Sequence, residues 1–121
     1  MKRYYSLICL MLLALSVHAQ DNLRLMTYNV HNAKGMDGVR DLQRIANVIL
    51  DAAPDVVAIQ EVDSMTTRYR CHLLGELAAR THMYASFAPS IKIKLGKYGL
   101  GVLSKERPIR TKRVELPGKE E

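Results

Sequence analysis

The feature that most constrains the fold is a short apolar run, Val56–Ile59, which directly follows an amphipathic stretch. An uninterrupted run of this length is typical of a strand that is covered on both faces. Before it, apolar residues recur every three or four positions, which predicts a helix over residues 39–52. The expected buried residues of this helix are Leu42, Ile45, Ala46, Ile49 and Ala53. Pro54 ends the helix, because proline disfavours the helical conformation in the residue before it.

Other segments show the patterns of strands, loops and one more helix. In chain order, we predict a strand over 23–30, a loop over 32–38, a helix over 67–80, a strand over 84–88, a basic segment over 91–97 that ends in a glycine turn, and strands over 98–104 and 109–116. This alternation of strands and helices, followed by further strands, predicts an α/β fold.

The first 19 residues have the layout of a secretory signal peptide. A basic head precedes an apolar run from Ser6 to Val17, and cleavage is expected after Ala19. The run is shorter than the about 20 residues that a membrane-spanning helix needs. We therefore expect an exported protein without a stable membrane span, and a folded part over residues 20–121. The alternative is an N-terminal membrane anchor.

The charge of the chain is mildly positive. The formal net charge is +6, and Lys2 and Arg3 in the predicted signal peptide supply two of these charges. A positive surface suits an anionic partner such as a phosphate ester, but it does not require one.

Polar side chains stand where the first two predicted strands end. Asn29 lies at the end of the first, and Gln60 and Glu61 at the end of the second. If the strands are parallel neighbours, these side chains converge on the edge of the sheet where ligands bind. A carboxylate beside amide groups suits Mg²⁺, Mn²⁺ or Ca²⁺ better than zinc. Taken alone, however, a strand-end glutamate is more often solvated or caps a helix, and an asparagine is more often a turn residue.

Three segments of the chain resemble the endonuclease/exonuclease/phosphatase family, which has the deoxyribonuclease-I-like fold. They are Leu25–Val30, Pro54–Val62 and Tyr98–Ser104, in the family's order and at about its spacing. The resemblance implies the N-terminal half of a two-sheet α/β sandwich, with residues 20–121 as a partial domain. It also implies metal-dependent hydrolysis of phosphodiesters or phosphomonoesters. The substrate class stays open between nucleic acid, phospholipid headgroups and small phosphate esters.

The resemblance assigns roles to particular residues. It implies that Glu61 binds the divalent metal and that Asn29 helps to position the metal and the phosphate. Both are therefore expected in the catalytic site, with Gln60 supporting it through a hydrogen bond. His31 is either a phosphate contact or a loop histidine without a catalytic role.

Lysines 92, 94 and 97 form a basic segment with two interpretations. They either steer an anionic substrate or form the solvated face of a hairpin, and we favour the second. His72 and His82 are expected to be structural. Asp37 is expected to serve a turn or a helix cap rather than to bind calcium.

Two segments that the family uses in catalysis are missing from the sequence. One resembles Gly-Asp-Phe-Asn and supplies the base, and the other resembles Ser-Asp-His and contacts phosphate. We therefore predict that this chain is an N-terminal fragment that is inactive and poorly stable by itself, and that the complete protein is a monomer. The alternative is a secreted, non-catalytic binding module or relic on the same scaffold, so that the sequence leaves open whether the chain is an enzyme.

Overall fold

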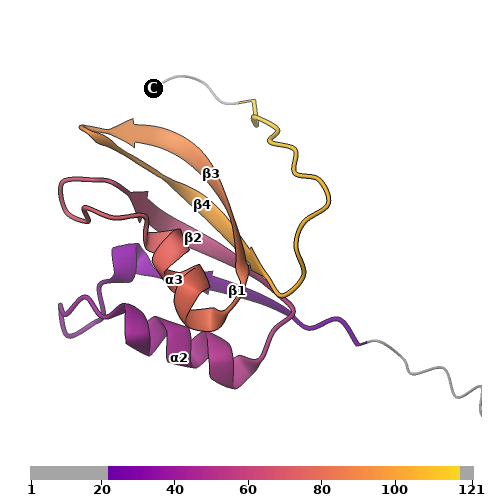
Figure 1. Ribbon diagram of the computed structural model, residues 1–121. Coiled ribbons are helices and arrows are strands. Elements are labelled where there is room, and N and C mark those ends of the chain that lie inside the picture. The colour runs from indigo at the N-terminus through magenta and orange to yellow at the C-terminus, as the bar shows by residue number, and fades with distance from the viewer. Residues whose placement is uncertain (1–21, 118–121) are drawn as a thin grey trace, which may run out of the picture.

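The computed structural model describes residues 22–117 and shows an α/β fold, as predicted (Figure 1). Its elements are β1 (Leu25–Asn29), the short 3-10 helix η1 (His31–Ala33), α2 (Leu42–Ala52), β2 (Val56–Ser64), α3 (Leu73–Thr81), β3 (Tyr84–Ile93) and β4 (Gly96–Ser104). The predicted signal peptide lies outside the described residues. No helix within residues 22–117 is long and apolar enough to cross a membrane.

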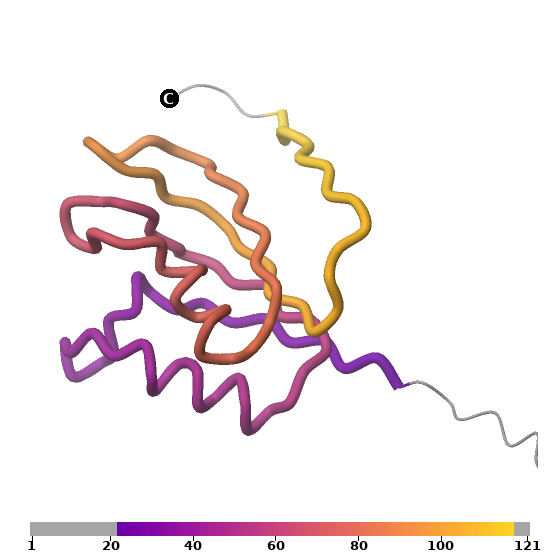
Figure 2. The backbone as a smooth tube through the Cα atoms, viewed as in Figure 1, coloured from indigo at the N-terminus to yellow at the C-terminus, as the bar shows by residue number. Residues whose placement is uncertain are grey.

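The four strands form one sheet in the order β1-β2-β4-β3, and the path of the chain can be followed in Figure 2. β1 and β2 are parallel, and β4 runs antiparallel to both β2 and β3. The parallel pairing places Asn29, the last residue of β1, opposite Gln60. β2 does not end there as predicted, because it continues beside β4 to Ser64. The convergence expected from the sequence therefore holds for the backbone.

Both helices pack on one face of the sheet, where the core lies (Figure 1). Side chains from β2, α3 and β4 are almost completely buried there, including Val57, Ile59, Leu77 and Leu103. Gly101 of β4 permits this close packing, because a Cβ atom at this position would lie 2.6 Å from Leu74 Cδ1. The core thus holds β2 and β4 firmly beneath α3.

The opposite face of the sheet is open within the described residues. Leu25 is 68% exposed and Leu100 is 52% exposed, and Ala58 of β2 is exposed as well. The prediction that Val56–Ile59 is covered on both faces is therefore wrong for residues 22–117. Apolar residues on both faces produced that prediction, but α2 and α3 cover only one of them.

Both helices begin later than predicted. At the start of α2, the carboxylate of Asp41 accepts hydrogen bonds from the backbone N–H groups of Gln43 and Arg44 at 2.9 and 3.2 Å. This cap satisfies donors that have no partner inside the helix, which places the first residue at Leu42. α3 begins only at Leu73, because the segment before it forms a loop with its own hydrogen bonds.

The end of α2 shows a second difference. Ala53, predicted to be buried, is exposed and has a φ of 46°, in the left-handed region. Its N–H donates to the carbonyls of Ile49 and Leu50, which ends the helix at Ala52, two residues before Pro54.

The later strands also differ from the prediction. β3 continues past the expected residue 88 to Ile93, with a register irregularity between Pro89 and Ile91 that accommodates the proline. The strand predicted over 109–116 is wrong, since residues 105–117 form no helix or strand. Both edges of β4 are already paired, so that this segment finds no free backbone partner beside the strand it follows.

Candidate functional site at the ends of β1 and β2

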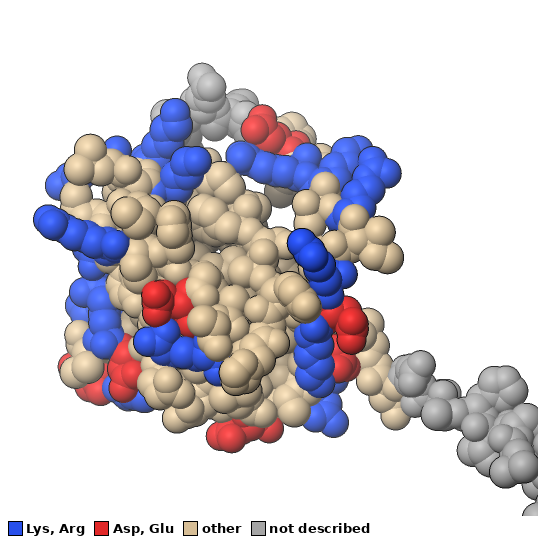
Figure 3. Space-filling model, viewed as in Figure 1, with Lys and Arg blue, Asp and Glu red and all other residues tan. Residues whose placement is uncertain are grey.

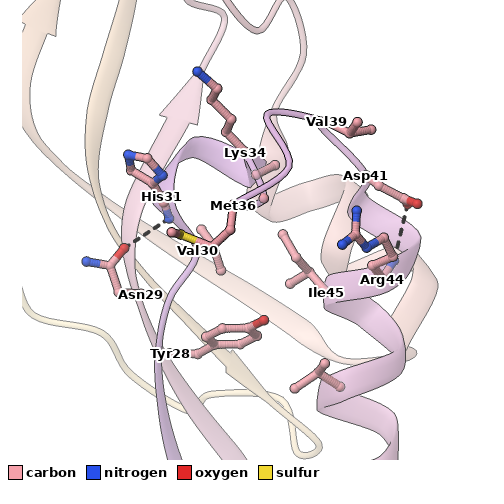
Figure 4. A pocket seen from close by; sticks show the side chains of 13 residues that line it. Tyr28, Asn29, Val30, His31, Lys34, Met36, Val39, Asp41, Arg44 and Ile45 are labelled. Atoms are coloured by element: carbon pink, nitrogen blue, oxygen red, sulfur yellow. Dashed lines mark hydrogen bonds between the residues drawn. The ribbon is translucent and has the colours of Figure 1, made fainter.

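A direct hydrogen bond joins the two predicted site residues. Asn29 Nδ2 donates to Glu61 Oε1 at 2.9 Å. Asn29 Oδ1 accepts from the backbone N–H of His31, also at 2.9 Å (Figure 4). The backbone N–H can only donate and the ionised carboxylate can only accept, so the two contacts together set the orientation of the amide. Asn29 therefore links η1 to the Glu61 carboxylate, while metal binding by Asn29 itself stays a prediction.

A β-bulge lets Glu61 reach Asn29. The pairing of β2 with β4 shifts between Ile59 and Val62, so that Gln60 and Glu61 together fill the space of one residue. In a regular strand, Gln60 and Glu61 would point to opposite faces, and only Gln60 would share a face with Asn29. Glu61 has a φ of 61°, which is unfavourable for a residue with a side chain. We call the edge of the sheet at Asn29, Gln60 and Glu61 the rim. The rim thus holds Glu61 in a strained conformation.

Gln60 makes its hydrogen bonds away from the Asn29–Glu61 pair. Its Nε2 donates to Thr27 Oγ1 at 3.0 Å and to the carbonyl of Ala58 at 3.3 Å. Gln60 therefore bridges β1 and β2 just behind the rim. Neither bond contacts Asn29 or Glu61, so a supporting role of Gln60 in the site stays a prediction.

The turn after β1 has an unusual backbone. His31, Asn32 and Ala33 have φ values of 45°, 53° and 61°, so that three consecutive residues lie in the left-handed region. Such a conformation costs about 1–2 kcal/mol for each non-glycine residue. The turn is held by hydrogen bonds from Ala33 N to Val30 O and from Lys34 N to His31 O. It leaves the His31 side chain exposed beside Asn29 (Figure 4), and its contact with phosphate stays a prediction.

The sequence did not predict an ion pair near Glu61 that joins a buried aspartate to a partly exposed arginine. The Asp63 carboxylate is completely buried and accepts from Arg68 Nε at 2.6 Å and from Arg68 Nη2 at 3.0 Å. The same Nη2 donates to Asn32 Oδ1 at 2.9 Å. The bond to Asp63 is the main reason why the pKa of Arg68 is raised. This ion pair fastens the loop after β2 to η1.

Tyr98 is a further residue of this region that was not predicted. It lies opposite Asp63 in the sheet, and the guanidinium of Arg68 lies 5.4 Å from the centre of its ring. Burial raises the pKa of Tyr98, and the negative charge of Glu61 raises it further. The phenol therefore stays protonated and can donate a hydrogen bond. The only signal in the sequence was its place at the start of the segment Tyr98–Ser104.

An open cavity of about 360 Å³ lies beside the rim, between the turn after β1 and α2 (Figure 4). Asn29 and His31 line its rim side, and Tyr28 and Ile45 contribute apolar surface. Arg44 also lines it, but its guanidinium is paired with Asp37 at 2.7 Å. This contact, with the bond from Val39 N to Asp37 Oδ1, agrees with the turn role expected for Asp37.

Glu61 is the carboxylate of the rim that a divalent cation could use as a ligand. Glu61 is half-buried and forms no ion pair with a lysine or arginine of residues 22–117, whereas Asp55 and Asp63 each have one. Within the same residues, no three His, Cys, Asp or Glu side chains gather to hold a metal. Glu61 thus fits one ligand position of a cation such as Mg²⁺, which commonly binds one or two carboxylates together with water and phosphate oxygens.

The chain is similar in sequence to known proteins. The model of the Endonuclease/Exonuclease/phosphatase family matches residues 26–119. An uncharacterized protein of Caenorhabditis elegans is 38% identical over 76 residues, which are 60% of this chain and 24% of that protein. The chain therefore spans about a quarter of that relative.

Two solved structures share the fold. An endonuclease/exonuclease/phosphatase of Beutenbergia cavernae matches 70% of this chain and 26% of its own, with 28% identity and a TM-score of 0.57. A family protein of Leptotrichia buccalis matches 71% of this chain and 39% of its own, with 18% identity and a TM-score of 0.56. With the family model matching most of its length, this chain belongs to the endonuclease/exonuclease/phosphatase family.

Proposed function

We propose that this chain supplies the Glu61 side of the active site of an exported, metal-dependent phosphoesterase. The observation that carries the proposal is the Asn29–Glu61 hydrogen bond of 2.9 Å at a strained bulge. Membership of the family supports hydrolysis of phosphate esters, including a nuclease-type activity. Export rests on the signal peptide predicted over residues 1–19.

The residues of the rim have complementary roles in this proposal. A divalent cation at Glu61 would neutralise charge on the phosphate and lower the pKa of water. Asn29 donates to one carboxylate oxygen of Glu61 and leaves the other free for the cation. Tyr98 lies opposite Asp63 in the sheet, and burial together with the charge of Glu61 raises its pKa. His31, exposed at the same edge, is the candidate for contact with the phosphate.

A non-catalytic binding module is the second candidate. It is favoured by the fact that residues 22–117 bring no three metal-ligating side chains together. Under this alternative, the full-length protein binds a phosphorylated ligand but shows no turnover with any divalent cation.

The test measures Mn²⁺ binding to the full-length protein by electron paramagnetic resonance and Mn²⁺-dependent hydrolysis of a generic phosphodiester. Glu61→Gln should weaken Mn²⁺ binding and abolish hydrolysis. Glu106→Gln makes the same chemical change at an exposed glutamate beyond β4 and should leave both unchanged. Equal Mn²⁺ affinity of the two variants would contradict the role of Glu61. The 121-residue chain by itself should show no turnover, and robust hydrolysis by it would overturn the expectation that it is inactive alone.

A further inference from the structure

The turn between β3 and β4 exposes aliphatic side chains among lysines. We define the hairpin tip as residues 91–97. Ile91 is 54% exposed and Leu95 is 90% exposed, at the end of two paired strands. Met65, which is 48% exposed, adjoins the tip, since a Cβ atom on Gly96 would lie 2.5 Å from the Met65 carbonyl carbon. Three aliphatic side chains therefore share one end of the molecule.

The charge at this end has one sign. Lys92, Lys94 and Lys97 are exposed, and none forms an ion pair with an acidic group of residues 22–117. The two segments that meet here, residues 64–75 and 82–104, contain no aspartate or glutamate. Basic side chains gather around the end of the hairpin in Figure 3. The aliphatic groups are thus surrounded by unneutralised positive charge.

The pairing of the strands places the hairpin tip relative to the Glu61 rim. Lys97 lies opposite Ser64, and Tyr98 lies opposite Asp63, near the carboxyl end of β2. The tip therefore extends beyond the same end of the sheet as Glu61, as the chain path shows (Figure 2). A partner surface that binds the hairpin tip would therefore face the end of the sheet that carries Glu61.

The exposed aliphatic side chains and lysines of the hairpin tip together indicate which class of partner it fits. A solvated hairpin face requires no exposed aliphatic residues. A nucleic-acid backbone binds lysines, and single strands also stack on aromatic rings, which residues 91–97 lack. An anionic lipid surface uses both features, because aliphatic side chains enter the acyl boundary while lysines meet the headgroups.

We propose that the hairpin tip docks on an anionic phospholipid surface, with Leu95 and Ile91 entering the interface and the three lysines on the headgroups. The two contributions are both needed, since a single weak apolar anchor binds membranes only marginally. The inference does not depend on the proposed hydrolysis. Accordingly, Glu61→Gln, which should lose activity, keeps its membrane binding.

The experiment measures sedimentation of the full-length protein with vesicles of phosphatidylcholine alone or mixed equally with phosphatidylglycerol. Binding is expected only to the mixed vesicles and should fall with salt. Each lysine near such a surface contributes about fivefold, so K92Q/K94Q/K97Q should weaken binding about a hundredfold. Leu95→Ser should weaken it about tenfold.

Two control variants remove the same kinds of side chain from the exposed segment after β4. Ile109→Ser removes an aliphatic side chain that is fully exposed in the segment after β4, and R107Q/R110Q/K112Q removes three charges from that segment. Both should bind the mixed vesicles like the unaltered protein, and circular dichroism melting should show that all variants fold. Failure of the unaltered protein to bind mixed vesicles would overturn the proposal. So would equal binding by Leu95→Ser, and DNA binding that needs the lysines but not Leu95 would assign the tip to nucleic acid instead.

Discussion

Two carboxylates flank the part of β2 that pairs with β1, Asp55 directly before it and Glu61 directly after it, and their surroundings differ. At the first end, Asp55 Oδ2 accepts from the backbone N–H of Arg24 at 2.7 Å, and Oδ1 accepts from Lys105 Nζ at 2.9 Å. At the other end, Glu61 accepts from the neutral amide of Asn29 and has no cationic partner within residues 22–117. The Asp55 carboxylate thus has a cationic partner within the described residues. The Glu61 carboxylate has none there, which is why we propose it as the ligand of an external cation.

The backbone shows the same contrast. Among residues 22–117, eight non-glycine residues have a positive φ, and six of them lie at the Glu61 end. They are His31, Asn32, Ala33, Glu61, Met65 and Lys94. The remaining two, Ala53 and His82, end helices, where this conformation is common. Backbone strain is thus concentrated where the candidate chemistry lies, a distribution that is typical of functional sites.

The largest expected effect separates activity from stability at Glu61. If the proposed phosphoesterase activity holds, Glu61→Gly should lower kcat/KM about a thousandfold, because the proposed metal ligand and its several kcal/mol of charge stabilisation are lost. It should also raise the free energy of unfolding by about 1 kcal/mol, since glycine adopts the positive φ without strain. Urea denaturation and steady-state kinetics measure the two effects. A marked loss of stability would show that the Glu61 end is held together like the Asp55 end.

Asn29 tests whether the amide positions the carboxylate. Asn29→Ala should lower kcat/KM about 10–100-fold, the usual cost of losing a group that orients a metal ligand. Asn47→Ala, which removes an exposed asparagine of α2 bound only by Gln43 in the described structure, is the matched control. Kinetics over a range of Mn²⁺ concentrations provides the measurement. Equal activity of both variants would contradict the role of Asn29.

Asp63 is a third carboxylate in this region, and its ion pair with Arg68 is expected to stabilise the fold. Asp63→Ala should lower the free energy of unfolding by about 2 kcal/mol, because it removes two charge-assisted hydrogen bonds from Arg68. Urea denaturation measures the loss. Stability like that of the unaltered protein would mean that the ion pair does not fasten the loop. Glu76→Ala, which breaks an exposed pair with Arg80, is the control and should change stability by less than about 1 kcal/mol.

The smallest effect concerns Asp55 and pH. The Arg24 N–H and Lys105 hold the pKa of Asp55 below its ordinary value of 3.8 in the folded protein. Its contribution to stability is therefore present above about pH 4 and is lost as the pH falls through the lower folded-state pKa. Asp55→Asn should melt earlier than the unaltered protein at pH 7, and the difference should shrink in acid. A difference that does not change with pH would contradict this assignment.

Local patterns were sufficient to predict several features. The spacing of Leu42, Ile45, Ala46 and Ile49 predicted the buried face of α2, and all four are buried. The order of strands and helices predicted the α/β class and the convergence of Asn29 with the end of β2. These features follow from periodicity along the chain, which depends on neighbours a few residues apart.

Other features depend on partners that are distant in sequence. Arg68 follows its partner Asp63 by only five residues, but it also contacts Asn32 and Tyr98, which lie in the turn after β1 and in another strand. The strand predicted over 109–116 failed beside the strand that it follows, because both edges of β4 are paired, while the free edges of the described sheet belong to β1 and β3.

The sequence by itself determined the alternation of residues in β1, the apolar face of α2, and the polar groups that lie where the pairing of β1 with β2 ends. Only the tertiary structure decided that Glu61, and not just Gln60, shares a face with Asn29. The physical reason is the bulge in β2, which places two residues opposite one of β4 and reverses the side to which Glu61 points. A bulge is set by the pairing of two strands about 40 residues apart, and no local pattern of the chain encodes it.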